Sequence, residues 1–199
     1  MNKKSISLFA AGACCALFIT TSVVRSQDAE GGPPMDPEAM AAMMPGPMHA
    51  HLAKLAGEWN IEGKYRMAPG EEWVPFNGHG TRKLVFEGRH MVEDFRSEFM
   101  GMPYNGSGVT GYDNLRGEYN SIWYDNSSTG MMVCTGSAND AGTEITLLGE
   151  SSDAMTGETH KWFKMRHRIL GADNTVFESY AKTESGEEWL SMELNYTRK

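Results

Sequence analysis

The side chain in this sequence that could carry chemistry most directly is the imidazole of His167. It stands in the run 159–170 at alternate positions with Phe163 and Met165, and alternate residues share one face of a strand. An inward, neutral imidazole can ligate haem iron. It can also exchange a proton with a carboxylate such as Glu93, if the two groups face each other across an interior. A hydrogen-bonded histidine of the core is the simpler interpretation, and all three stay open.

A second group of potential ligands lies near the start of the chain. Met44 and Met48 are followed at once by His49 and His51, and thioether and imidazole groups side by side suit copper. A short amphipathic helix that packs its methionines on the domain explains the same residues. We therefore expect no metal here and keep these four residues as the alternative metal site.

The sequence lacks the usual catalytic signatures. It contains no Gly-x-Ser-x-Gly, no glycine-rich phosphate loop and no His-Glu-x-x-His. The glycines of Gly106-Ser107-Gly108 are predicted to allow a close backbone approach or a bulge. A non-enzymatic protein without a cofactor is favoured, and haem on His167 is the alternative.

Strands must position these side chains, because turn signals recur at regular intervals after Trp59. Examples are Asp113-Asn114 with Gly117 and Asp125-Asn126 with Gly130. The runs between them are rich in β-branched and aromatic residues, which is typical of an antiparallel meander. No helix long enough for a parallel crossover separates them, which excludes an α/β fold. We predict an all-β, up-and-down barrel of about ten strands, near residues 59–67, 73–86, 89–99, 105–112, 119–125, 131–137, 144–150, 159–170, 175–183 and 189–198. The second of these strands could be interrupted.

Alternation also predicts which residues would contact a ligand inside such a barrel. A one-residue slip at a bulge would turn a face outward, and ordinary core packing is the favoured alternative for Tyr119 and Trp123. The predicted contacts are Glu93, His167, Met91, Phe95, Tyr119, Trp123, Phe163 and Met165.

The stretch LAKLAGEWNIEGKY marks the start of the barrel. Its helix-forming first part breaks at Gly57, and an alternating strand begins with Trp59 on its inward face. The last strand reads Leu190, Met192, Leu194, Tyr196 and Arg198 on one face. We expect the guanidinium of Arg198 to stack across the indole of Trp59 and close one end of the barrel.

These features resemble the calycin group, which includes lipocalins and fatty-acid-binding proteins. The chain from Asp36 to Lys199 is more closely similar to a bacterial domain of unknown function, family 1579. The matching pieces are Met35 to Met40, Leu52 to Trp59, Met100 to Pro103, Thr110 to Asn114, Trp123 to Asn126, Met155 to Gly157 and Tyr196 to Lys199. The resemblance implies a short helix before a calycin-like barrel, with the tryptophan and the late arginine packed together at the closed end. It implies no established activity.

Residues 1–26 are predicted to be a secretory leader, because two lysines precede an acid-free apolar run. Cleavage would release the protein to the periplasm or the exterior, and retention as a membrane anchor is the alternative. Residues 27–47 are predicted to form a linker rich in Pro, Gly and Met, with a short helix entered at Asp36-Pro37. Residues 48–199 are assigned to the barrel.

Charge and cysteine content narrow the partners further. The formal charge is −8, and removal of the leader takes away Lys3, Lys4 and Arg25 and no acidic residue, which changes it to −11. A nucleic-acid partner is excluded, because phosphate binding needs a basic surface. Cys134 would be the sole remaining cysteine, and we expect it to be a small buried hydrophobe.

The expected function is therefore binding of a small, partly apolar molecule inside an exported barrel. The alternative is an interaction protein whose barrel is filled by its own side chains and which meets its partner through the Met-rich arm or a barrel face. An interior cavity of about 300 Å³ or more would favour ligand binding.

Overall fold

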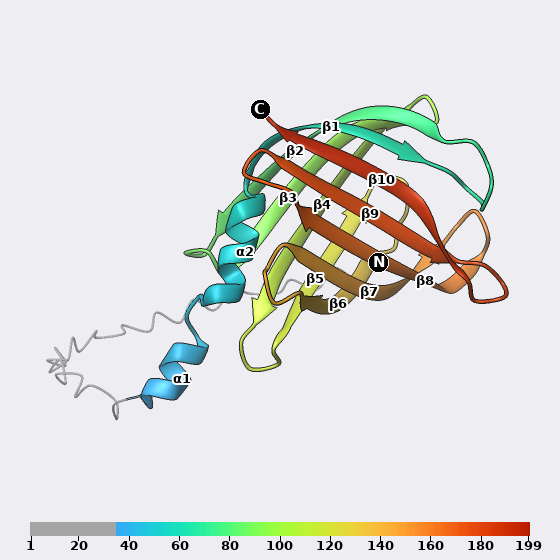
Figure 1. Ribbon diagram of the computed structural model, residues 1–199. Coiled ribbons are helices and arrows are strands. Elements are labelled where there is room, and N and C mark those ends of the chain that lie inside the picture. Colours follow the sequence, from blue (N-terminus) through green and yellow to red (C-terminus); the bar gives the residue numbers. More distant parts are fainter. Residues whose placement is uncertain (1–34) are drawn as a thin grey trace, which may run out of the picture. The chain divides into compact units, whose positions relative to one another are not determined.

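Ten antiparallel strands close into a barrel in the computed structural model, which describes residues 35–199 (Figure 1). Each strand pairs with its neighbours in sequence, and β1 also pairs with β10. The predicted all-β, up-and-down barrel is thereby confirmed. The predicted leader and the first part of the linker lie outside the described residues. The strands are β1 Gly57–Tyr65, β2 Val74–Val85, β3 His90–Phe99, β4 Met102–Asp113, β5 Glu118–Asp125, β6 Met132–Ala138, β7 Glu144–Asp153, β8 Glu158–Ile169, β9 Asn174–Lys182 and β10 Glu188–Arg198.

Aspartate and glycine at a fixed spacing form two of the tight turns. In the β4–β5 turn, the N–H of Gly117 donates to the backbone carbonyl of Asp113 at 2.8 Å, and Gly157 and Asp153 repeat this bond in the β7–β8 turn. Both glycines have φ near +70° to +80°, a region that glycine adopts at little cost. The possible interruption of the second strand is absent, because β2 is continuous.

The predicted inward faces of β1, β3 and β8 are confirmed by burial and register. In β1, for example, Trp59 and Ile61 are buried, and Ile61 pairs with Tyr196 of β10. The prediction for Leu190 is wrong. A bulge between Leu190 and Met192 pairs Leu190 with Tyr180, on the outer face of β9, and returns Met192 to the inner face. The extra residue of a bulge reverses the alternation on one side of it.

Two short helices, α1 (Pro37–Ala42) and α2 (Pro47–Leu55), precede β1. Asp36 caps α1, since its Oδ1 accepts the N–H of Glu38 at 2.9 Å, and α1 buries no residue. The predicted short helix is confirmed in this form. Neither helix of residues 35–199 is long and apolar enough to cross a membrane.

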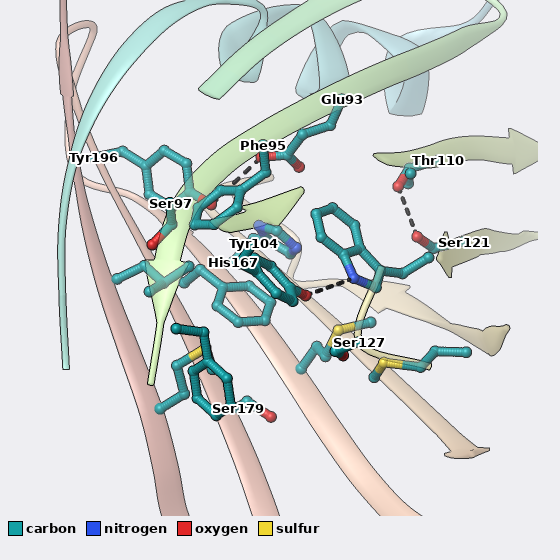
Figure 2. A pocket seen from close by; sticks show the side chains of 18 of the residues that line it. Glu93, Phe95, Ser97, Tyr104, Thr110, Ser121, Ser127, His167, Ser179 and Tyr196 are labelled. Carbon is teal, nitrogen blue, oxygen red and sulfur yellow. Dashed lines mark hydrogen bonds between the residues drawn. The ribbon is translucent and has the colours of Figure 1, made fainter. Parts of the chain in front are cut away.

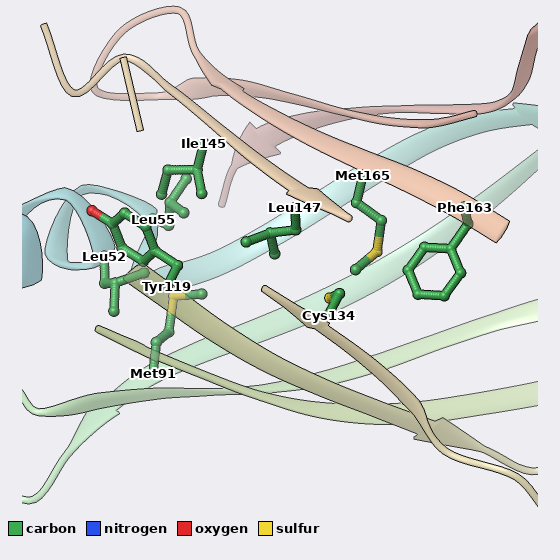
Figure 3. Close-up of a cluster of buried hydrophobic side chains, with 9 residues drawn as sticks. All are labelled: Leu52, Leu55, Met91, Tyr119, Cys134, Ile145, Leu147, Phe163 and Met165. Atoms are coloured by element: carbon green, nitrogen blue, oxygen red, sulfur yellow. The ribbon is translucent and has the colours of Figure 1, made fainter. Parts of the chain in front are cut away.

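Helix α2 lies across one end of the barrel. Leu52 and Leu55 are 0% and 1% exposed, and they pack in one cluster with Met91 of β3, Tyr119 of β5 and Ile145 of β7 (Figure 3). We call this the covered end. The loops that join β1 to β2 and β3 to β4 lie at the opposite end, because successive strands run antiparallel.

The predicted closing contact between the two chain-terminal strands is present. Trp59 and Arg198 are register partners, and the Arg198 guanidinium lies 4.3 Å from the centre of the indole. The indole N–H donates to the carbonyl of Leu55 at 3.0 Å, and Nη1 of Arg198 donates to that of Ala56 at 2.7 Å. A Cβ at Gly57 would lie 2.1 Å from the same Nη1, so only glycine leaves room for the arginine.

The hydroxyl of Tyr119 ties α2 to the barrel and offers a test of this end of the fold. It donates to the carbonyl of Met48 at 2.8 Å and lies 3.0 Å from Nδ1 of His51. Tyr119→Phe should lower the free energy of unfolding by about 1–2 kcal/mol, because the part-buried Met48 carbonyl and the His51 ring both lose the hydroxyl that they contact. Urea denaturation measures the change. The matched control is Tyr124→Phe, whose ring is 46% exposed, and an equal effect in both variants would contradict the prediction.

Candidate functional site

A cavity of about 300 Å³ lies inside the barrel (Figure 2). It extends from Met91 and His167, toward the covered end, to Phe99 and Ser127 at the opposite loops. Aromatic and thioether side chains form most of its wall, and a few hydroxyl and charged groups interrupt them. This volume falls at the lower end of the range of about 300–1,000 Å³ for small-molecule sites.

Six of the eight predicted ligand contacts line this cavity: Met91, Glu93, Phe95, Trp123, Met165 and His167. Tyr119 and Phe163 also face inward, but they do not line it. Tyr119 is 0% exposed beneath α2, and Phe163 packs in the same core cluster, where a Cβ at Gly149 would lie 2.8 Å from its ring. Alternation identifies the inner face of a strand, and it does not tell which part of the interior a helix or a neighbouring ring fills.

Glycines on the inner face of β4 explain why Trp123 lines the cavity. A Cβ at Gly106 would lie 2.2 Å from the indole, and one at Gly108 would lie 2.9 Å from it. The Trp123 ring therefore lies directly against the β4 backbone and leaves volume at the barrel centre. This is the close approach predicted for the Gly-Ser-Gly stretch. From the sequence, ordinary core packing was the favoured alternative for Trp123.

A buried charge pair lies at the covered end of the cavity. Arg82 of β2 is 2% exposed, and its Nε lies 3.0 Å from Oε1 of Glu93. The Tyr196 hydroxyl donates to the same oxygen at 3.4 Å, and the guanidinium stacks on the Tyr196 ring at 4.1 Å. Sequence reasoning missed Arg82. Gly78, Gly80 and Arg82 share one face of β2 and could have indicated an inward arginine. They were not recognised because this face has no run of apolar residues to mark it as the inner one.

His167 is partly buried and faces the cavity. Its ring packs edge-on against Phe177, with the ring centres 4.9 Å apart. Burial, and then the nearby positive charge of Arg82, lower the pKa of His167 to about 3, so the imidazole is neutral at physiological pH. Within residues 35–199 no hydrogen bond joins this ring to another group. The alternative His167–Glu93 pair is not formed, because Arg82 and Tyr196 hold the Glu93 carboxylate.

Haem does not fit this arrangement. A neutral imidazole is a competent iron ligand, but a cavity of about 300 Å³ is small for a tetrapyrrole. The wall is also formed by large, packed rings such as Phe95 and Trp123, and those rings would have to move.

A second polar cluster lies where the cavity approaches the loops. Trp123 Nε1 and the Tyr104 hydroxyl donate to Oδ2 of Asp125 at 3.0 and 2.8 Å, and Ser127 donates to Oδ1. Burial opposes ionisation of Asp125, but the hydrogen bonds from Ser127, Tyr104 and Trp123 outweigh it and hold the pKa of this carboxyl below its ordinary value. Asp125 therefore carries a negative charge. Glu98 lies on the cavity wall, whereas Asp125 lies behind Tyr104 and Trp123 and is not part of it.

The Met and His residues considered for copper have structural partners. Nδ1 of His49 accepts the N–H of Gly46 at 3.0 Å. Since the Tyr119 hydroxyl gives its proton to a carbonyl, Nδ1 of His51 donates to that hydroxyl. The Sδ of Met44 accepts from Arg89 at 3.4 Å, and Met48 packs against the core. Among residues 35–199, no three His, Cys, Asp or Glu side chains form a group that could hold a metal.

Comparison with known proteins identifies the family. Residues 44–198 match the sequence model of the family described as "Protein of unknown function (DUF1579)". The chain belongs to this family. A search of curated proteins finds no match.

A solved structure supports the fold of this DUF1579 protein. The crystal structure of Rv2717c from M. tuberculosis aligns with a TM-score of 0.59 and 15% sequence identity, over 77% of this chain and 98% of that one. At this level of identity the similarity concerns the fold alone.

Proposed function

We propose that this protein binds one small, partly apolar molecule inside its barrel. The observation that carries the proposal is the cavity of about 300 Å³, walled largely by aromatic and thioether groups within a closed sheet. Water gains little in such a space, because few wall groups are free to bond it. An apolar ligand would bury its surface there and contribute the usual hydrophobic free energy.

The cavity also bears on the alternative function. An interaction protein with a filled barrel has no need of an interior space of this size, so the volume favours ligand binding. We also propose that this action takes place outside the cytoplasm, which rests on the leader predicted from residues 1–26.

Filling the cavity provides the test of binding. Ser179 lies on the cavity wall, and Ser179→Leu adds apolar volume to it. We expect native mass spectrometry of the wild-type protein, purified from its own host, to show one co-purifying small molecule. Overpacking should lower its affinity in the variant by about tenfold.

The matched control is Ser137→Leu, which places the same side chain on the exposed outer face of β6. Its occupancy should equal that of the wild-type protein. Equal losses in both variants, or wild-type protein that carries no molecule and takes up no apolar probe, would contradict the proposal.

A further inference from the structure

The charges around the proposed binding cavity are already paired within the protein. Arg82 is neutralised by Glu93 at 3.0 Å, and Tyr196 contacts both groups. Nη2 of Arg82 has no hydrogen-bond partner among residues 35–199, but Arg82 is not part of the cavity wall. A ligand therefore meets Glu93 and Tyr196, and no positively charged side chain of the described residues lines the cavity to bind an anion. Burying a charge without a partner is strongly unfavourable.

Most polar groups of the wall are likewise bonded to each other. The hydroxyls of Thr110 and Ser121 lie 2.8 Å apart (Figure 2). Ser97 donates to the carbonyl of Glu98, and the Tyr104 hydroxyl donates to Asp125. These groups have little capacity left for a ligand.

His167 differs from these groups. Its ring faces the cavity, it has no hydrogen-bond partner in the described part of the chain, and it is neutral because its pKa is lowered to about 3. A neutral imidazole offers one N–H donor and one acceptor nitrogen. Among residues 35–199 the hydroxyl of Ser179 also has no hydrogen-bond partner. Ser179 lies farther than His167 from the covered end, so it would meet a different part of the ligand.

The approach to the cavity disfavours anions as well. Ionised Asp125 bonds Tyr104 and Trp123 of the cavity wall, and Glu98 lies on that wall. The whole chain carries a formal charge of −8. A cation would be attracted at this point, but farther in it would meet a carboxylate that is already paired with Arg82.

We propose that the cavity selects uncharged molecules with an apolar, ring-sized body and one hydroxyl, carbonyl or similar group, and that this group forms its hydrogen bond with His167. The inference rests on the proposed function and names the ligand class of that same site.

Four probes with one skeleton test it: naphthalene, 2-naphthol, 2-naphthoate and 2-(aminomethyl)naphthalene, each titrated into the full chain at neutral pH by calorimetry. We expect 2-naphthol to bind at least about tenfold more tightly than the carboxylate or the amine, since each charged probe must lose its hydration without gaining a partner. It should also bind more tightly than naphthalene by about tenfold, the typical value of one hydrogen bond.

Variants of His167 test whether this residue forms the hydrogen bond to the ligand. His167→Phe should remove the preference for 2-naphthol over naphthalene while naphthalene still binds. His167→Gln, which keeps a donor and an acceptor, should restore part of that preference. The matched control is His160→Phe, on the exposed outer side of β8, where the preference should be unchanged.

The outcomes separate the two proposals. If naphthalene binds but the carboxylate or the amine binds most tightly, the ligand class is wrong and the proposed function stands. If 2-naphthol keeps its advantage in His167→Phe, the assignment to His167 is wrong. If no probe binds the wild-type protein, both proposals fail. Should His167→Phe not fold, the ranking of the probes on wild-type protein still decides the ligand class.

Discussion

Replacing Arg82 by methionine should lower the free energy of unfolding by about 3–5 kcal/mol. The guanidinium is 2% exposed, and the Glu93 side chain that faces it is 12% exposed. Removing the arginine leaves a carboxylate in the barrel with only the Tyr196 hydroxyl to stabilise it. The loss measures this uncompensated charge rather than the net contribution of the ion pair. Urea denaturation followed by tryptophan fluorescence would measure it.

The double variant Arg82→Met with Glu93→Leu completes the experiment. Removing both charges should bring the stability back to within about 1–2 kcal/mol of wild type, because buried ion pairs often contribute little beyond apolar residues of similar size. Lys64→Met is the control, since it breaks a bridge to Glu193 at 2.9 Å whose lysine side chain is 39% exposed. Such a bridge should be worth less than about 1 kcal/mol. Equal losses in Arg82→Met and Lys64→Met would refute the argument.

Trp59→Ala should also lower the free energy of unfolding by about 3–5 kcal/mol, the usual range for a large buried aromatic residue. The indole is 1% exposed, bonds the Leu55 carbonyl and lies beneath the Arg198 guanidinium. The substitution therefore opens a cavity at the point where β1 meets β10. It also leaves the Leu55 carbonyl without its donor and the Arg198 guanidinium without the ring on which it stacks. The midpoint of chemical denaturation provides the measurement.

A second tryptophan supplies the comparison. Trp73 precedes β2 and is only partly buried, and the cationic groups of Lys64 and Arg66 lie 5.1 and 4.6 Å from its ring. Cation–π contacts of this kind are worth about 0.5–1 kcal/mol at exposed sites, so Trp73→Ala should cost far less than Trp59→Ala. If the two losses are similar, the closing contact is not central to the barrel.

The strands could be predicted because their limits depend on local chemistry. The Asp113–Gly117 and Asp153–Gly157 turns need only backbone and side-chain groups within five consecutive residues. The inner faces of β3 and β8 followed from a two-residue period, which any single strand displays. The closing contact of Trp59 with Arg198 was predictable because the first and last strands of a closed meander must pair.

Contacts across the interior could not be predicted in this way. His167 was one candidate partner of Glu93 in the sequence, but the partners of Glu93 in the structure are Arg82 on the adjacent strand and Tyr196. Both candidate pairs satisfy the alternation, and the distance between two inward side chains depends on the curvature of the barrel. The predicted orientation of Leu190 was wrong for a related reason, because a single inserted residue in β10 has no distinct signature in the sequence.

Sequence alone therefore determined the approximate number of strands, their order and the inner faces of β1, β3 and β8, because these follow from short-range periodicity and turn chemistry. The tertiary structure decided which end α2 covers, where Trp123 lies, which charge neutralises Glu93 and how much space remains around His167. Those properties arise from the packing of residues far apart in the chain, since the size and polarity of a cavity are set by all of its walls together.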